Sequence, residues 1–328
     1  MFEQELETGQ HAVTEAMRIT RTIQDELAGN NAITKADKSP VTIADFAAQA
    51  VVCRILNNYF PDTPIVAEER SHALQKPEHR EILDKILHYI DKDSRVKEIL
   101  NKDNLFQSID LGGGEPNNGV FWTLDPVDGT KGFLRGQQFA IALALIVEGE
   151  VQLGILGCPN LSIPHHQSTQ GYLLFAIKGQ GTRLVNAESG ETQTVRVSNI
   201  TDPPKMRFVE SYESSHSNLD KQLQIARMLK MEQEPVRMDS QVKYGVVATG
   251  NAEIYLRIPN PKTPDYREKI WDHAAGSLVV EEAGGVVTDI SGKKLDFNTG
   301  KTLKNNRGIF ASVPVVHNLI IEILEEMA

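Results

Sequence analysis

Cysteine is scarce in this chain of 328 residues, which has only Cys53 and Cys158. Their separation matches no metal-binding spacing, so we expect two reduced thiols rather than a disulfide framework. Long apolar runs are also missing, since the longest, residues 139–147, is less than half of the roughly 20 residues that span a bilayer. The first ten residues are acidic and polar, unlike a signal or transit peptide. These absences predict a cytoplasmic protein with no membrane partner.

Basic residues are outnumbered by acidic ones, with 34 Lys and Arg against 44 Asp and Glu, for a formal net charge of −10. Proteins that bind nucleic acid usually carry a basic face, so this balance argues against a nucleic-acid partner. A local basic pocket is still compatible with it. The hydrophobic share of 40% and the length allow one large domain or two of ordinary size.

The first part of the chain predicts helices followed by an antiparallel sheet. Apolar positions recur at helical spacing over residues 9–27 and again from near Asp45 to before Pro61. Residues 63–70 favour a short buried strand that ends on two acids. Residues 139–160, FAIALALIVEGEVQLGILGCPN, indicate two strands joined by a turn, and further strands follow. We expect an α+β unit over residues 1–200.

A charged, helix-like excursion interrupts this part at residues 72–118 and ends in the glycine-rich run GGGEPNNG. Two interpretations remain open, a segment that shapes or covers a site and a variable surface insertion.

The second part, residues 201–328, alternates between strand-like and helix-like segments after a candidate linker at residues 199–205. Such alternation is typical of a parallel sheet flanked by helices, so we expect a smaller, mainly parallel sheet of α/β type.

The segment WTLDPVDGTKGF, residues 122–133, carries the most chemical information. It places Asp125 and Asp128 at the end of a strand-like run, with Gly129 and Thr130 directly after them. Two carboxylates, a turn and a hydroxyl suit hard divalent cations, which prefer oxygen ligands. The alternative is an ordinary turn in which Asp128 caps a helix.

Other acids stand at the ends of predicted elements: Asp45 opens a helix, Glu68 and Glu69 close a strand, and Asp272 opens a late helix. Together with the central pair they match a two-metal phosphoryl site. In that arrangement Asp125 bridges two ions, Glu68 serves the first, and Asp128 with Asp272 serves the second. The carbonyl of Val127 adds a ligand, while Thr130 orients water and Asp45 accepts its proton.

Four segments, SPVTIADFAAQ, IVAEE, WTLDPVDGTKGF and IWDHAAGSLVVEEAGG, occur in this order and resemble the signatures of the inositol monophosphatase superfamily. The resemblance implies a layered αβαβα sandwich of the inositol monophosphatase and fructose-1,6-bisphosphatase type. It also implies Mg²⁺ as cofactor, with two or three ions, and inhibition by lithium. The metal ligands that it implies are Glu68, Asp125, Val127, Asp128 and Asp272, with Asp45 and Thr130 as the catalytic pair.

Finer segments, TKGFLRGQQFAIALALI, LGILGCPN, DSQVKYG and IYLRIP, resemble one branch, the 3′(2′),5′-bisphosphate nucleotidases. That branch implies removal of the 3′-phosphate from 3′-phosphoadenosine 5′-phosphate by direct attack of a metal-activated water, as part of sulfur metabolism. Phosphoadenylyl sulfate and inositol 1,4-bisphosphate are further candidate substrates, and a monomer is expected. The implied substrate contacts are Gly129, Thr130, His216, Ser240, Lys243 and Arg257. Leu219 departs from the branch, which has a second histidine there.

Three rival functions share much of this pattern. An inositol monophosphatase or inositol polyphosphate 1-phosphatase has the same metal residues and differs in the pocket. A fructose-1,6-bisphosphatase shares the superfamily but not the pocket segments. A catalytically silent binding protein keeps the fold, but retention of the whole acid set argues against it.

Overall fold

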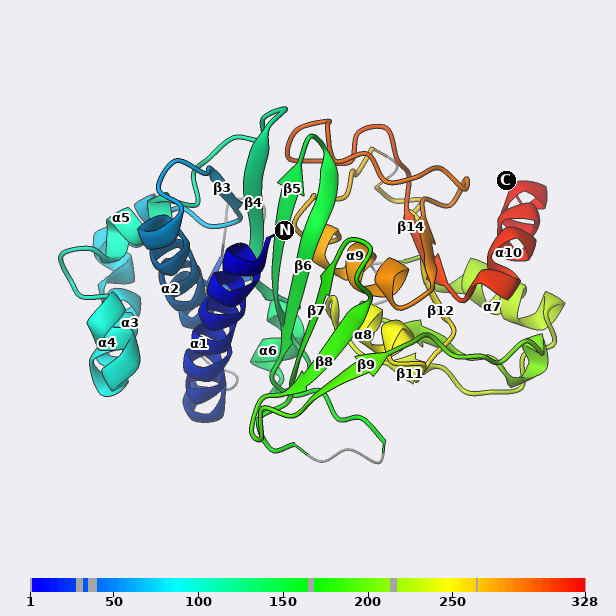
Figure 1. Ribbon diagram of the computed structural model, residues 1–328, viewed down its shortest axis with the longest axis horizontal. Helices are drawn as coiled ribbons and strands as arrows, with labels where there is room; N and C mark the ends of the chain where they lie inside the picture. Colours follow the sequence, from blue (N-terminus) through cyan, green and yellow to red (C-terminus); the bar gives the residue numbers. More distant parts are fainter. Residues whose placement is uncertain are drawn as a thin grey trace.

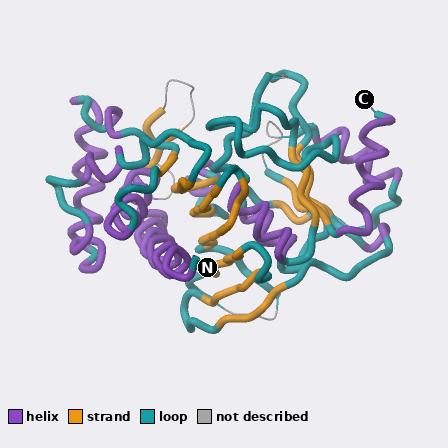
Figure 2. Tube along the Cα trace, turned by 45° about the horizontal axis from the view of Figure 1, so that its top comes forward, coloured by secondary structure: helices purple, strands orange, loops and turns teal. Residues whose placement is uncertain are grey.

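The computed structural model describes residues 2–27, 32–34, 40–164, 168–212, 217–263 and 265–327. Helices and sheets alternate in layers across the molecule (Figure 1). From one side to the other these are α1 and α2, a seven-stranded sheet, α8 and α9, a five-stranded sheet, and α7 and α10. Figure 2 shows the same order, with helices outside both groups of strands. The predicted layered αβαβα sandwich is therefore confirmed.

The first layer contains α1 (Glu3–Leu27) and α2 (Ile43–Tyr59). The helix α1 begins six residues before the predicted start, since the preceding segment EQELETG is rich in helix formers and carries acids in the first turn. The helix α2 begins at Ile43, two residues before the predicted start near Asp45, so Asp45 lies inside its first turn. In the chain, a short antiparallel pair of strands, β1 (Ala32–Thr34) and β2 (Pro40–Thr42), follows α1 and precedes α2.

The large sheet has the strand order β3-β4-β5-β6-β7-β8-β9. Every neighbouring pair is antiparallel except β3 with β4, which is parallel. The strands are β3 (Ile65–Ala67), β4 (Val120–Asp128), β5 (Ala140–Val147), β6 (Glu150–Cys158), β7 (Tyr172–Ile177), β8 (Thr182–Asn186) and β9 (Thr192–Val195), with the short helix α6 (Thr130–Leu134) after β4.

The excursion at residues 72–118 is helical, as predicted, and lies beyond α2 at the edge of the molecule (Figure 1). It contains α3 (Arg80–Lys92), α4 (Ser94–Ile99) and α5 (Leu105–Asp110). Its glycine-rich end returns along β3, where the amide of Ala67 donates to Gly112 O at 2.9 Å and the amide of Gly114 donates to Ile65 O at 2.9 Å. The excursion therefore braces the edge strand β3.

The small sheet has the order β11-β10-β12-β14-β13. The prediction of a mainly parallel sheet is right for one half only, because β10 pairs in parallel with β11 and β12, whereas β14 pairs antiparallel with β12 and β13. No helix crosses between β13 and β14, so the chain returns in the opposite direction. The elements are β10 (Phe208–Glu210), α7 (Leu219–Met228), β11 (Val236–Arg237), α8 (Val242–Ala248), β12 (Ile254–Arg257), α9 (Ala274–Glu282), β13 (Val286–Thr288), β14 (Ile309–Ser312) and α10 (Pro314–Glu326).

Two glycines of β6 let helices approach the large sheet from opposite faces. A Cβ added at Gly154 would lie 2.7 Å from the carbonyl oxygen of Ala275 in α9. A Cβ added at Gly157 would lie 2.6 Å from Val13 in α1. Residues three apart on a strand face opposite sides, so the sheet accepts one helical layer on each. These contacts set the thickness of the sandwich.

Apolar side chains form three buried clusters, of which the second fills the spaces on both sides of the α8–α9 layer. Trp122 is fully buried in the first cluster. The second cluster takes residues from both sides of residue 200, including Leu156 from β6 and Tyr255 from β12. The division into units at 1–200 and 201–328 stays a prediction, and a shared core joins the two parts.

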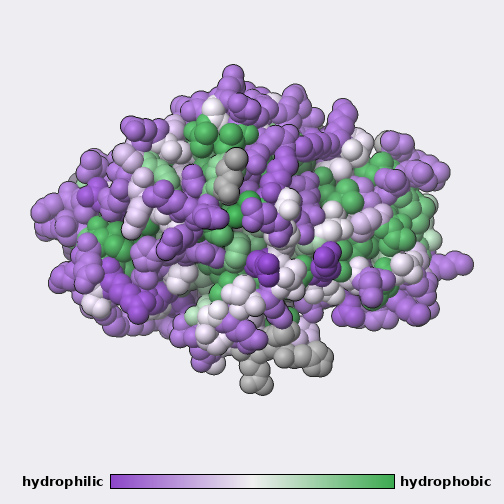
Figure 3. All heavy atoms as spheres, in the orientation of Figure 1, coloured by the Kyte–Doolittle hydropathy of each residue, from purple (hydrophilic) through white to green (hydrophobic). Residues whose placement is uncertain are grey.

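Hydrophilic side chains cover most of the face shown in Figure 3. Among the described residues, no helix has the length and apolarity that crossing a membrane requires.

We expect Gly154→Ala to lower the free energy of unfolding by about 1–3 kcal/mol, because the new methyl group would push α9 away from the sheet. Urea unfolding followed by circular dichroism measures this change. Gly119→Ala is the matched control, since its Cβ would meet only a side-chain atom at 3.4 Å. Equal stability of the two variants would show that the close approach carries no strain.

Candidate metal-dependent active site

A cleft of about 220 Å³ lies where β4 ends and the second half of the chain packs against it. Its walls come from β4, the start of α6, the segment before α8, the end of β12 and the segment before α9. The lining residues are Glu68, Asp125, Val127, Asp128, Gly129, Thr130, Lys131, Asp239, Gln241, Tyr255, Arg257, Tyr266, Asp272 and His273.

An irregularity in β4 gives Asp125 and Asp128 a common side. Asp125 pairs with Ala142 and Asp128 with Ala140, so three steps along β4 match two along β5. Residues three apart on a regular strand face opposite ways, but one extra residue resets the alternation. Both acids accordingly line the same cleft.

The turn after β4 depends on Gly129, which has a left-handed φ of 89°. A side chain there would be strained, and its Cβ would lie 2.8 Å from the Cβ of Ser240. The hydroxyl of Thr130 donates to the carbonyl of Val127 at 3.2 Å, which closes the turn. On the other side, the backbone amide of Gln241 donates to the Asp128 carboxylate.

The acids in the cleft repel one another. Burial, followed by the negative charges of Glu68, Asp128, Asp272 and Asp45, raises the pKa of Asp125 well above its usual range. Burial, with Asp128 and Glu68, likewise raises the pKa of Asp272 well above its usual range.

Burial raises the pKa of Asp128 too, although Lys243, the amide of Gln241 and Arg257 act against it.

The donor set fits divalent cations. Oδ1 of Asp125 is buried and has no hydrogen-bond partner among the described residues. Buried carboxylates without enough compensating positive charge are costly, and a cation with oxygen ligands removes that cost. Glu68, Asp125, Asp128 and Asp272 offer carboxylate oxygens at the cleft, and Val127 contributes to the same wall.

The residue Glu68 is placed by a buried glutamine of α2 that the sequence analysis missed. Gln49 Oε1 accepts from the amide of Glu69 at 2.8 Å, and Gln49 Nε2 donates to the Glu69 carbonyl at 2.9 Å. The same Nε2 donates to the carbonyl of Ile109 in α5 at 2.8 Å. Gln49 lies one helical turn after Asp45, and that spacing was the available signal.

A second group of potential metal-binding atoms comprises Glu268, Asp272 and His273, all within 4.8 Å of one another. Glu268 already accepts from Arg257 Nε at 2.8 Å and lies 3.1 Å from His273 Nε2. These partners lower the pKa of Glu268 to about 2 in spite of its burial. We therefore treat its carboxylate as one half of an ion pair.

The predicted site residues fall into three groups. Glu68, Asp125, Val127, Asp128, Gly129, Thr130, Arg257 and Asp272 line the cleft. Asp45, Ser240 and Lys243 are buried near it but are not among the lining residues. His216 lies outside the described residues.

Lys243 and Ser240 are not surface residues that simply contact the substrate. Burial lowers the pKa of Lys243 to about 8, and Asp128 is the charge that most opposes this shift. Its Nζ lies 5.3 Å from the centroid of the Tyr255 ring. Ser240 has an unusual left-handed φ of 70° directly before the amide that binds Asp128. Both residues thus lie behind the carboxylate of Asp128.

Several lining residues were not predicted, namely Lys131, Asp239, Gln241, Tyr255 and Tyr266. Lys131, Asp239 and Gln241 adjoin predicted site residues in sequence, and Tyr255 lies in the quoted segment IYLRIP, whereas Tyr266 carried no recognisable signal. His273, which also lines the cleft, is buried, and its Nδ1 lies 2.8 Å from the hydroxyl of Tyr244.

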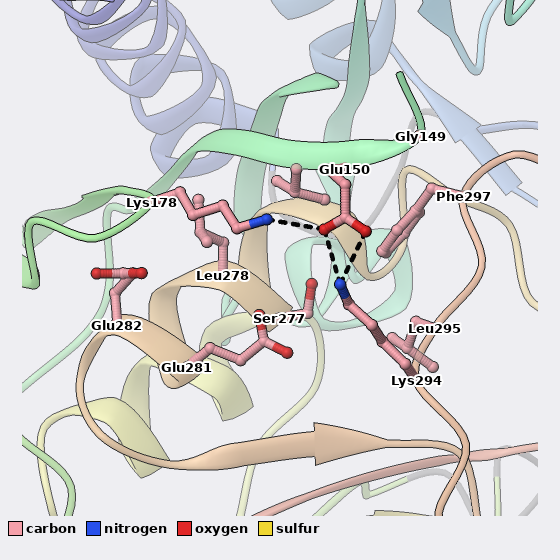
Figure 4. A pocket seen from close by; sticks show the side chains of 11 residues that line it. Gly149, Glu150, Lys178, Ser277, Leu278, Glu281, Glu282, Lys294, Leu295 and Phe297 are labelled. Atoms are coloured by element: carbon pink, nitrogen blue, oxygen red, sulfur yellow. Dashed lines mark hydrogen bonds and ion pairs between the residues drawn. The ribbon is translucent and has the colours of Figure 1, made fainter. Parts of the chain in front are cut away.

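A second cavity, of about 70 Å³, lies beside the last turn of α9 (Figure 4). Its two lysines, Lys178 and Lys294, both point to Glu150, at 2.8 and 2.7 Å. The carboxylate of Glu282 accepts from the amides of Gly179 and Gly181 at 2.7 and 2.8 Å. These contacts fix the end of α9 that is opposite Asp272.

The sandwich fold and the acid-lined cleft define a class, that of layered αβαβα proteins with a carboxylate-rich cleft that suits divalent cations. Within that class the chain belongs to the inositol monophosphatase family, whose family model matches residues 4–328. The match covers nearly the whole chain.

Curated relatives share about 40% of the sequence over most of their length. The chain is 42% identical to "3′(2′),5′-bisphosphate nucleotidase" of Oryza sativa, with 94% of this chain and 90% of the relative covered. It is 39% identical to "3′(2′),5′-bisphosphate nucleotidase 1" of Candida albicans, with 99% and 96% covered.

Solved structures support the fold. An IMPase of Thermotoga maritima superposes with a TM-score of 0.67 at 20% identity, covering 99% of this chain and 98% of that chain. The extragenic suppressor protein suhB of Bartonella henselae gives 0.67 at 18% identity, covering 99% of each.

Removing divalent cations should destabilise the fold in a pH-dependent way. The raised carboxylate pKa values mean that the metal-free native state binds more protons than the unfolded state, so its stability falls as pH rises above about 4. We expect EDTA to lower Tm more at pH 7.5 than at pH 5.5. Saturating Mg²⁺ at about 100 times its Kd should restore about 2.7 kcal/mol.

Scanning calorimetry in EDTA and with Mg²⁺ at about 100 times its Kd measures this difference. A cation effect of the same size at both pH values would contradict mutual repulsion among the acids.

Proposed function

We propose that this protein is a metal-dependent phosphatase that removes the 3′-phosphate from 3′-phosphoadenosine 5′-phosphate and leaves AMP. The observation that carries the proposal is roughly 40% identity, over nearly the full length, to relatives named 3′(2′),5′-bisphosphate nucleotidases. The cleft agrees in chemistry, because an acid-rich wall faces Arg257 across one small space.

Magnesium is the proposed cofactor, held by Glu68, Asp125, Asp128, Asp272 and the carbonyl of Val127. Bound there as two or three ions, it would neutralise phosphate charge and lower the pKa of a water molecule. All of the proposed ligands are oxygen atoms, as Mg²⁺ prefers.

The chain itself supplies the proton acceptors and the positioning groups. The hydroxyl of Thr130 is held at the carbonyl of Val127, so it has a fixed direction in which to orient the attacking water. Asp45 is buried in the first turn of α2, and its charge acts on Asp125. We assign the final acceptance of the proton to Asp45.

The second phosphate of the substrate needs positive charge beyond that of the metal ions. Arg257 lines the cleft and offers planar N–H groups suited to phosphate. Lys243 contributes positive charge from behind Asp128, and Ser240 and Gly129 shape the backbone between them. His216 remains a proposed contact without a structural position.

The alternative is a phosphatase for inositol phosphates, which would use the same acids. Phosphate release from 3′-phosphoadenosine 5′-phosphate, inositol 1,4-bisphosphate and inositol 1-phosphate, each with Mg²⁺, separates the two. We expect the nucleotide to have the highest kcat/KM and Li⁺ to inhibit its hydrolysis. A higher value for either inositol substrate would overturn the proposal. Phosphate release that is independent of Mg²⁺ would overturn the metal assignment.

We expect Asp125→Asn to lower kcat by about 10³-fold or more, since bound metal supplies several kcal/mol of transition-state stabilisation. The same change should raise Tm in EDTA, because it removes a carboxylate whose charge is unfavourable in the metal-free fold. Asp62→Asn, at an exposed position, is the matched control. Wild-type turnover by Asp125→Asn at saturating Mg²⁺ would rule out its bridging role.

A further inference from the structure

Arg257 is held in place by one buried carboxylate that does not line the cleft. Glu268 is 7% exposed, and its Oε1 accepts from Arg257 Nε at 2.8 Å. The guanidinium carbon also lies 6.0 Å from the centroid of the Tyr266 ring. A guanidinium is planar and has five N–H groups in fixed directions, so binding Nε sets where the remaining four point.

The second oxygen of the same carboxylate reaches the segment that carries Asp272. Glu268 Oε2 lies 3.1 Å from His273 Nε2, and His273 Nδ1 lies 2.8 Å from the hydroxyl of Tyr244 in α8. This series of contacts leads from Arg257 in the cleft to the interface between α8 and α9.

The backbone of Glu268 is fixed independently of its side chain. The amide of Leu303 donates to the Glu268 carbonyl at 2.9 Å, and the amide of Ile270 donates to Lys301 O at 3.2 Å. The carboxylate therefore starts from an anchored position when it holds Arg257.

We propose that Glu268 is a positioning residue that aims the Arg257 guanidinium at the phosphate that is not cleaved. It thereby determines the preference for substrates with two phosphates over those with one. This inference rests on the proposed function, because Arg257 is taken to bind that second phosphate.

The experiment compares a bisphosphate with a monophosphate that has the same reacting group. Wild-type protein and Glu268→Gln are assayed with 3′-phosphoadenosine 5′-phosphate and adenosine 3′-monophosphate at saturating Mg²⁺. Loss of a charged hydrogen bond should lower the ratio of the two kcat/KM values about 10- to 100-fold, mainly through a higher KM for the bisphosphate. In an Arg257→Met background, Glu268→Gln should change the ratio less than about 2-fold, since the group it positions is gone.

Glu282→Gln is the matched control, because it removes a structural carboxylate at the opposite end of α9. It should leave the substrate ratio unchanged. An equal loss on both substrates by Glu268→Gln would mean a purely structural role and would overturn the inference. A higher Mg²⁺ requirement with an unchanged ratio would make Glu268 a metal ligand and would overturn it too.

Failure of the proposed function has a different signature. In that case wild-type protein would show no preference for the adenosine bisphosphate over the monophosphate. The same variants are then compared on inositol 1,4-bisphosphate and inositol 1-phosphate, where a ratio unaffected by Glu268→Gln contradicts the inference by itself.

Discussion

Repulsion among buried carboxylates is the constraint on which the rest of this structure depends. Asp125 is buried and surrounded by the charges of Glu68, Asp128, Asp272 and Asp45, and its burial, followed by these charges, raises its pKa well above the usual range. No single element holds the whole group: Asp125 and Asp128 share β4, and the other acids come from elements that are each fixed by other contacts. The large sheet, α2 and the segment before α9 act as rigid supports for charges that would otherwise separate.

The supports are themselves specific. The irregularity in β4 turns two acids to one side, and Gln49 fixes the backbone after β3. The amide of Gln241 meets Asp128, while the side chain of Gln241 donates to the carbonyl of Trp271 at 2.8 Å, next to Asp272. The cleft is thus assembled from hydrogen bonds between the two halves of the chain and not from the acids alone.

Much of this could be predicted from sequence, for identifiable physical reasons. Periodic apolar positions indicated α1 and α2, and acids at element ends indicated which residues meet at the cleft. The pairing of β13 and β14 could not be predicted, since local pattern does not determine strand direction when no helix intervenes. Gln49, Tyr255 and Tyr266 were also missed, because their importance comes from tertiary contacts between distant segments.

The return of the excursion along β3 has a consequence for solubility. An open sheet edge offers unpaired backbone groups to strands of other molecules and is a common origin of aggregation. Here Gly112 and Gly114 occupy backbone groups of β3, and an isolated bridge joins Val66 to Gly113. The segment that braces β3 next to Glu68 therefore also closes this edge of the sheet. The same contacts that hold the Glu68 side of the cleft in place thus protect the protein against strand pairing between molecules.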